Sequence, residues 1–365
     1  MEQIINKERN YGIDLLRIVS MYLVVVLHLL GSADIEAYLP LCSLKYEVAW
    51  LLEMLAFCAV NCYALISGYV AINRRRGIAN LIVLWFQVWF YSVIIASILS
   101  VLYPELVSKE ILIKSFFPVI TKQYWYFTAY FGLFLVMPLL MYALTNLSKV
   151  ELKRIIIIGF VLFSILPMLV DEDIFQTANG YSMLWLGYLF LMGGYIRRYG
   201  VFETWSLKKI LFIWCVSIIF PLGIKFMIEY ISWNYLGILI ISRSLTKYTS
   251  PNVVIQAVVM LISFSRIRIS RFWKKIISFI SPASFGVYLI HSNELVLEKF
   301  LFGKLEIFSQ YSTVGMVVSV VFSAFVIFSV CVIIDLVRMK IFELVRVKKF
   351  ANTISEKWEK TEIFG

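Results

Sequence analysis

Long apolar runs separated by short polar segments follow one another along the whole chain. A helix that crosses the hydrocarbon core of a bilayer needs about 20 predominantly apolar residues, and most of these runs approach or exceed that length. The pattern predicts an all-α, polytopic membrane protein with about ten transmembrane helices and no soluble domain. Residues 231–242 are a candidate re-entrant or interfacial segment. We place the spans at residues 13–31, 48–72, 79–103, 124–145, 154–170, 183–199, 208–230, 251–266, 274–296 and 312–337.

Positive charge alternates between the segments that connect these spans. With the N-terminus in the cytoplasm, the inner segments hold 24 of the 34 Lys and Arg residues. The outer loop at 171–182 has no Lys or Arg and begins with Asp171, Glu172 and Asp173. This alternation is the positive-inside pattern, so we expect both termini to be cytoplasmic. It also accounts for the net charge of +11 without nucleic acid as a partner.

Composition agrees with a protein whose main partner is the lipid bilayer. Hydrophobic residues make up 61% of the chain, and the mean hydropathy is +0.85, well above that of a soluble domain. Residues 1–33 resemble a signal peptide, but the long apolar region and the position of Arg17 favour an uncleaved first span. We expect residues 1–337 to form one transmembrane domain. Residues 338–365 are expected to form a basic amphipathic tail on the inner leaflet.

The five cysteines form neither a disulfide framework nor a metal site. Cys58, Cys62, Cys215 and Cys331 lie in apolar stretches and only Cys42 lies in a predicted loop; no spacing resembles a set of metal ligands. No metal is therefore expected. We expect a bacterial cytoplasmic membrane, and the absence of a transit peptide and of a long outer disulfide-bonded domain agrees with this location.

Three ionisable residues share one face of the first predicted helix. At 100° per residue, Asp14, Arg17 and His28 form a stripe about 60° wide, and about 16 Å of helix separates Arg17 from His28. Ionisable groups in hydrocarbon are costly and normally face a cavity. Arg17 near the inner end has a second interpretation, in which it snorkels with Asp14 as its partner. A structural hydrogen bond is the corresponding alternative for His28; the shared stripe favours a functional role.

Further polar and aromatic residues lie near the ends of other spans. The second span carries Glu53 and Asn61 and ends with Ser67, Gly68 and Tyr69. Basic residues follow at once, and by themselves they indicate topology: Arg74, Arg75 and Arg76.

The fourth span opens at the outer face with Tyr124, Trp125 and Tyr126, which read first as an interfacial aromatic belt. Late in the chain, Tyr288 and His291 lie near the outer end of the ninth span. Taken alone, His291 is typical of an interfacial residue.

Together these stretches resemble the acyltransferase-3 family of bacterial membrane O-acyltransferases over essentially the whole chain. Arg17 and His28 match the family's Arg-x10-His pattern, and "FCAVNCYALISGYV" resembles its second helix. "QYWYFTAYFGLFLVMPLL" and "SPASFGVYLIH" are similar to two of its later spans. The resemblance implies ten helices and transfer of an acyl group, usually acetyl from acetyl-CoA, to a sugar hydroxyl outside the cytoplasm.

The resemblance also implies roles for these residues. His28 would be the catalytic histidine, Arg17 its partner and Asp14 an orienting group. Acyl-CoA would be the donor and would be held at the inner face by Arg74, Arg75, Arg76, Ser67 and Tyr69. The acceptor, a cell-surface or lipid-linked glycan, would contact Trp125, Tyr288 and His291.

Two departures from the family pattern bear on the prediction. Some relatives carry an appended soluble hydrolase-like domain. We expect no such domain after the tenth span, so that transfer would finish in the membrane domain or on a separate partner protein. The compact arginines at 74–76 do not align with the family's spaced arginines. The alternative class is a non-enzymatic transporter or flippase for a glycan or lipid-linked glycan, in which intramembrane charges hold substrate or protons. A membrane glycan polymerase would need a larger outer loop than this chain has.

Overall fold

The computed structural model describes residues 9–32, 35–72, 77–238, 240 and 244–360, and these residues form helices and no strand. The arginines at 74–76 lie outside the described residues. The longer helices are α1 (Tyr11–Ser32), α2 (Leu44–Ala71), α3 (Ile78–Leu102), α5 (Trp125–Asn146), α6 (Lys149–Phe160), α8 (Met183–Tyr199), α9 (Leu207–Tyr235), α10 (Pro251–Ser265), α11 (Arg271–Ile280), α14 (Thr313–Leu344) and α15 (Val347–Lys360). The short helices are α4 (Lys109–Ser115), α7 (Leu166–Val170), α12 (Ser284–His291) and α13 (Glu294–Phe300).

Seven helical segments of the described chain are long and apolar enough to cross a membrane, which confirms a multi-pass, all-helical protein. One of them, Lys149–Val170, is the continuous run of α6, a π-helical stretch at Val161–Ile165 and α7. Two predicted spans, 183–199 and 251–266, are the shorter helices α8 and α10, of 17 and 15 residues. The predicted span at 274–296 is broken into α11 and α12 by a single 3₁₀ turn at Ser281–Ala283, because Pro282 lacks the N–H that a continuous helix needs. Ten spans and the cytoplasmic position of both ends stay predictions.

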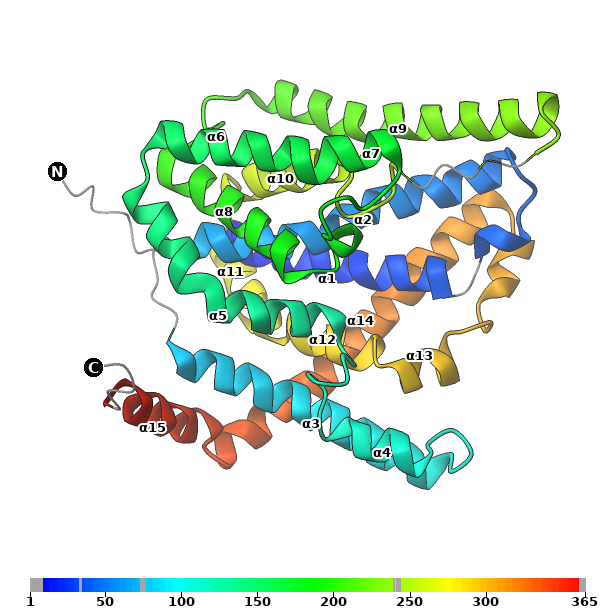
Figure 1. The fold of residues 1–365 in the computed structure, drawn as a ribbon. Helices are drawn as coiled ribbons and strands as arrows, with labels where there is room; N and C mark the ends of the chain where they lie inside the picture. The colour runs from blue at the N-terminus through cyan, green and yellow to red at the C-terminus, as the bar shows by residue number, and fades with distance from the viewer. Residues whose placement is uncertain (1–8, 33–34, 73–76, 239, 241–243, 361–365) are drawn as a thin grey trace.

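Helices α1, α2, α8 and α10 form the centre of the bundle, with α6, α7 and α9 along one side and α3, α14 and α15 along the other (Figure 1). The crossing of α2 and α8 depends on two glycines. A Cβ atom on Gly68 would lie 1.8 Å from the carbonyl oxygen of Phe190, and one on Gly193 would lie 2.0 Å from that of Leu65. Gly68 in the "SGY" stretch therefore permits a close approach of two helix backbones.

The last predicted span, α14, is followed almost at once by α15, which lies in the predicted tail. Helix α14 continues to Leu344, beyond the predicted end at residue 337. After it, α15 packs on α3 with Ala351 and Ser355 buried, while Phe350, Ile354 and Trp358 remain exposed. The start of α1 and helix α15 lie at the same end of the bundle, on the left of Figure 1.

A buried polar network fixes α14 against α3 and beside α12. Asp335 accepts hydrogen bonds from Gln87 and Tyr91 of α3 and forms an ion pair with Arg338 on its own helix. Gly286 of α12 packs directly on the Asp335 carboxylate, where a Cβ atom would come within 2.0 Å of an oxygen. The network thus sets the position of α12, which carries Tyr288 and His291.

Candidate active site

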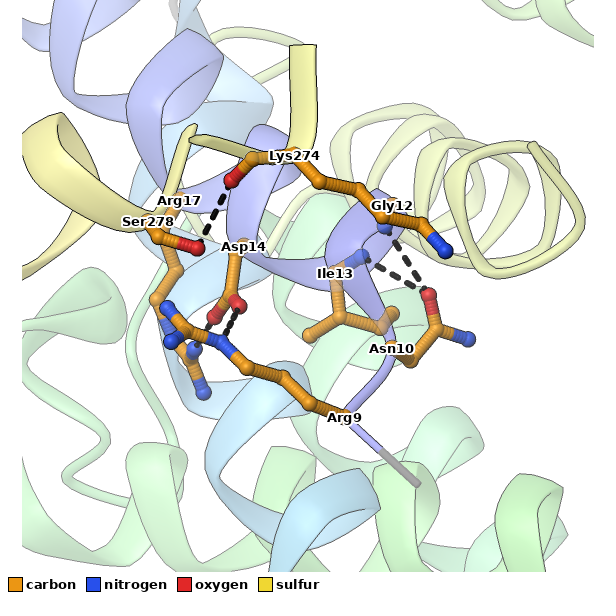
Figure 2. Close-up of polar contacts among 8 residues, drawn as sticks. All are labelled: Arg9, Asn10, Gly12, Ile13, Asp14, Arg17, Lys274 and Ser278. Carbon is orange, nitrogen blue, oxygen red and sulfur yellow. Dashed lines mark hydrogen bonds and ion pairs between the residues drawn. The ribbon is translucent and has the colours of Figure 1, made fainter. Parts of the chain in front are cut away.

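The first turn of α1 holds its charged residues in a defined arrangement (Figure 2). The side-chain oxygen of Asn10 accepts hydrogen bonds from the backbone N–H groups of Gly12 and Ile13 and so caps the helix. Asp14 lies between two arginines, with Arg9 Nε 2.5 Å from one carboxylate oxygen and Arg17 Nη1 on the other. The predicted pair of Arg17 and Asp14 is therefore present, and Arg9 joins it from the chain that precedes the helix.

The two histidines of the chain contact each other. His28 Nδ1 lies 3.0 Å from His291 Nε2, and the ring centroids are 5.0 Å apart. His291 is 1% exposed, and its Nδ1 lies 2.6 Å from the carbonyl oxygen of Val287. The predicted catalytic histidine and the predicted late-motif histidine thus form one pair at the ends of α1 and α12.

This geometry defines the proton arrangement of a neutral pair. The carbonyl oxygen of Val287 can only accept, so His291 Nδ1 carries the proton and its Nε2 is an acceptor. His28 Nδ1 must then donate to His291 Nε2. His28 Nε2 is left with a free lone pair, which is the state that a general base requires.

His28 lines a narrow, largely aromatic cavity of about 30 Å³. Its walls come from α1, α2, α5, α12 and the segment before α10, and they are Met21, Val24, Val60, Tyr63, Trp125, Tyr126, Tyr248, Phe285 and Tyr288. Trp125 and Tyr288, which the resemblance predicts to contact the acceptor, thus line the same cavity as His28. Aromatic rings, several of them with phenol groups, make up most of this wall.

Hydrogen bonds pin the end of α12 to the start of α5. Tyr124 is buried and donates its hydroxyl hydrogen to the carbonyl of Leu289, and it accepts from Asn293 Nδ2. The backbone N–H of Tyr126 lies 3.3 Å from the Tyr288 hydroxyl. The residues at the start of α5 thus hold the helix that carries His291, a role that an interfacial aromatic belt alone would not supply.

Two cavity residues were missed by sequence reasoning, Tyr63 and Tyr248. Tyr63 donates from its hydroxyl to the carbonyl of Arg17 at 2.7 Å. Tyr248 is held by Asn61, whose amide donates to the Tyr248 carbonyl and whose oxygen accepts from Trp185. Burial raises the pKa of the Tyr248 phenol well above its ordinary value, so this group stays neutral.

Arg17 lines a second and wider cavity, of about 420 Å³, at the other end of the α1 stripe. Both cavities border the same face of α1. Met21, Val24 and His28 line the first cavity, and Arg17 lines the second. On α5, Tyr126 of the first cavity stacks on Tyr130 of the second at a centroid distance of 6.4 Å. Lys348 and Asn352 of α15 complete the wall of the Arg17 cavity, together with Ala79, Asn80, Val83, Leu84, Tyr130 and Phe134.

The "SGY" residues do not line the Arg17 cavity. Ser67 donates its hydroxyl hydrogen to the carbonyl of Tyr63, one turn earlier on the same helix. The Tyr69 hydroxyl accepts a hydrogen bond from Arg197, whose guanidinium also lies over the Tyr69 ring. Over the described part of the chain, no group of three or more His, Cys, Asp or Glu side chains could hold a metal ion.

Helices of membrane-spanning length around a paired histidine and two cavities define, as a class, a multi-pass membrane protein with an internal polar site. A family model described as an acyltransferase domain matches residues 10–336. The chain belongs to this acyltransferase-3 family, as the resemblance predicted. No curated protein and no solved structure matches it.

Proposed function

We propose that this acyltransferase moves an acyl group, most simply acetyl, from cytoplasmic acyl-CoA to a hydroxyl of an extracytoplasmic glycan. The observation that carries the proposal is the histidine pair, which leaves His28 Nε2 free as a base inside an aromatic cavity. The family match supports acyl transfer. The donor, the acceptor and the direction of transfer are our inference from the site and the charge pattern.

The chemical step needs a base and an acid, and one imidazole can serve as both. In direct transfer, His28 Nε2 takes the proton of the acceptor hydroxyl while the oxygen attacks the thioester carbonyl carbon. The tetrahedral intermediate then collapses, the C–S bond breaks, and the thiolate receives the proton from His28. The products are an ester and CoA with a free thiol. The alternative, in which His28 Nε2 attacks first and carries the acyl group, uses the same free lone pair.

His291 acts through His28 rather than on the substrate. Its Nδ1 is committed to Val287, so its Nε2 orients the His28 ring and stabilises the imidazolium that forms when His28 takes a proton. In the Ser-His-Asp triad of other acyl-transfer enzymes, an aspartate orients the catalytic histidine and stabilises its imidazolium in the same way, with a carboxylate in place of the second imidazole.

The Arg17 cavity is the proposed site of the donor's phosphate-bearing end. Arg17 and Lys348 supply positive charge there, and Asn80 adds an amide; guanidinium and ammonium groups are the usual partners of phosphates. Ala79 and Asn80 at the start of α3 line this cavity. The arginines at 74–76, which the resemblance assigns to the donor, come only a few residues before them in the sequence. From this cavity the acyl end of the donor would follow the α1 stripe toward His28.

The acceptor would approach His28 from the opposite end, through Trp125, Tyr248 and Tyr288. Transfer to a polymer outside the membrane would be completed at this cavity or through a separate partner protein. A transporter or flippase for a glycan remains the second candidate class, and it would use the same aromatic cavity without releasing CoA.

The test is release of free CoA from acetyl-CoA by purified protein in liposomes, with candidate glycans added. We expect release that depends on the acceptor in the wild type, and loss of at least about 10²-fold in His28→Ala. Folding of both proteins is checked by thermal unfolding in detergent, and Tyr22→Phe, on the same helix, is the matched control.

Two other outcomes of this test would change the proposed function. Release that His28→Ala leaves unchanged would keep the enzyme class and overturn the role of His28. No release from either protein across a panel that includes the native cell-surface glycan would overturn acyl transfer in favour of transport.

A further inference from the structure

A third cavity, which we call the basic hollow, lies at the start of α1. Its volume is about 590 Å³. Five of its lining residues are cationic, and none of the ten described residues that form it is acidic; they are Arg9, Asn10, Tyr11, Arg197, Ser265, Arg266, Ile267, Arg268, Ile269 and Lys274. It shares no lining residue with the Arg17 cavity.

Three of the five cations are held in place by the protein. Arg266 donates to the carbonyls of Trp205 and Phe202, and Arg197 donates to the Tyr69 hydroxyl. Arg9 pairs with Asp14 on the carboxylate oxygen that Arg17 does not use. These interactions fix positive charge around the hollow, and among the described residues Asp14 is the one carboxylate that pairs with these three cations.

The other two cations, Arg268 and Lys274, are exposed at the rim. Within the described chain neither forms an ion pair with a carboxylate. Lys274 lies over the ring of Tyr11, which Arg9 approaches as well. Like charges gathered in this way repel one another, so an anion in the hollow would stabilise the fold.

The helix that borders the hollow indicates where this anion comes from. On α11, Phe272, Trp273 and Phe279 are exposed, although Ile277 on the same helix is buried against the protein. At 100° per residue, Lys274 lies on the side of α11 opposite Phe272 and Phe279. A helix with exposed aromatic residues on one side and a cation on the other is typical of the membrane interface, which would place Lys274 at the depth of lipid headgroups.

We propose that the basic hollow binds the phosphate headgroup of an anionic phospholipid from the leaflet at the start of α1. The fixed guanidinium groups of Arg197 and Arg266 form the floor, and Arg268 and Lys274 contact the phosphate at the rim. The acyl chains of the lipid pack along the apolar face of α11. Basic pockets between membrane helices bind acidic headgroups through this combination of charge and depth.

The site is separate from acyl transfer, and its test needs no enzymatic activity. Purified full-length protein is titrated in detergent with a short-chain phosphatidylglycerol and, in parallel, with the matching phosphatidylcholine. Bound lipid is counted by native mass spectrometry, and the shift in the unfolding temperature is measured. We expect saturable binding of phosphatidylglycerol with a rise in unfolding temperature, and neither effect with phosphatidylcholine.

The chain offers a matched pair of charge-neutralising variants. The double variant Arg268→Ala/Lys274→Ala removes two rim cations, and we expect it to weaken phosphatidylglycerol binding by about tenfold or more. The double variant Arg271→Ala/Lys275→Ala removes the same charge from α11 residues that do not line the hollow, and binding should stay as in the wild type.

Three results would overturn the proposal. Equal weakening by both double variants would show a diffuse attraction of the basic surface rather than a site. Equal binding of both lipids would exclude recognition of the anionic headgroup. Displacement of phosphatidylglycerol by CoA, lost in Arg268→Ala/Lys274→Ala, would assign the hollow to the nucleotide of the donor. If the wild type binds phosphatidylglycerol but shows no acceptor-dependent release of CoA, only the proposed function fails.

Discussion

His28 and His291 are 263 positions apart in the sequence, and their ring nitrogens lie 3.0 Å apart in the structure. The stripe on the first helix identified His28 by itself, because helical spacing can be read from one segment. The partnership could not be predicted in this way, since it depends on how α1 and α12 pack. Tyr248 was missed for a related reason: it lies in an irregular segment, where no periodicity marks an inward-facing residue.

The histidine pair predicts that His291→Ala lowers turnover by about 10²-fold and leaves the KM for acyl-CoA near the wild-type value. His291 holds the His28 ring and does not touch the donor. His291→Gln should recover part of the loss, because its amide oxygen can accept the hydrogen bond from His28 Nδ1. Steady-state kinetics with acetyl-CoA in liposomes measure both parameters. A raised KM with unchanged turnover would contradict this role.

The two arginines on Asp14 predict different effects on the donor. Arg17 lines the cavity that leads toward His28, whereas Arg9 lines the basic hollow. Arg17→Ala should weaken CoA binding by about tenfold, and Arg9→Ala, which removes the same charge from the same carboxylate, should not. Titration with CoA by isothermal calorimetry compares the two directly. Equal weakening would mean that the donor is held by the general charge of this end of α1.

At the scale of elements, apolar runs predicted most helices with ends within a few residues of those observed. The points at which a predicted span divides into two helices were less predictable. The ninth span reads as one apolar stretch, yet Pro282 divides it into a largely exposed α11 and a buried α12. The resemblance assigns Ser67 and Tyr69 of the "SGY" stretch to the donor, and this stays a prediction. Gly68, which lies between them, serves the crossing of α2 and α8.

This crossing predicts that Gly68→Ala is strongly destabilising. The added Cβ atom meets the backbone of α8, which cannot move as a flexible side chain can, so we expect a loss of about 1–3 kcal/mol in the free energy of unfolding. Gly223→Ala in α9 is the matched control, because no atom lies within 4 Å of its Cβ position. It should be neutral or stabilising by up to about 1 kcal/mol. Thermal unfolding in detergent distinguishes them, and equal effects would refute the tight crossing.

At the scale of the whole molecule, the alternation of positive charge predicts which end of the bundle faces the cytoplasm. Contacts between side chains do not determine this orientation. The start of α1 and helix α15 lie at one end of the bundle, and the Arg17 cavity opens between them. If that end faces the cytoplasm, the donor cavity has access to CoA. The loop that begins at Asp171 would then lie on the opposite side.

The orientation can be tested by cysteine labelling in intact cells. The exposed or half-buried native thiols, Cys215 and Cys42, are first replaced by serine. Glu172→Cys should react with a membrane-impermeant maleimide, whereas Lys208→Cys should react only after permeabilisation. The reverse pattern would invert the molecule and place the Arg17 cavity outside.

Tyr126 lines the His28 cavity and stacks on Tyr130, which lines the Arg17 cavity, and the two cavities share no lining residue. A protein that passes a chemical group from one face of a membrane to the other risks opening a leak for protons and ions. If the stacked rings of Tyr126 and Tyr130 close the route until a ligand parts them, no such leak opens between turnovers. The bilayer would then keep its electrical potential while the protein waits for its substrates.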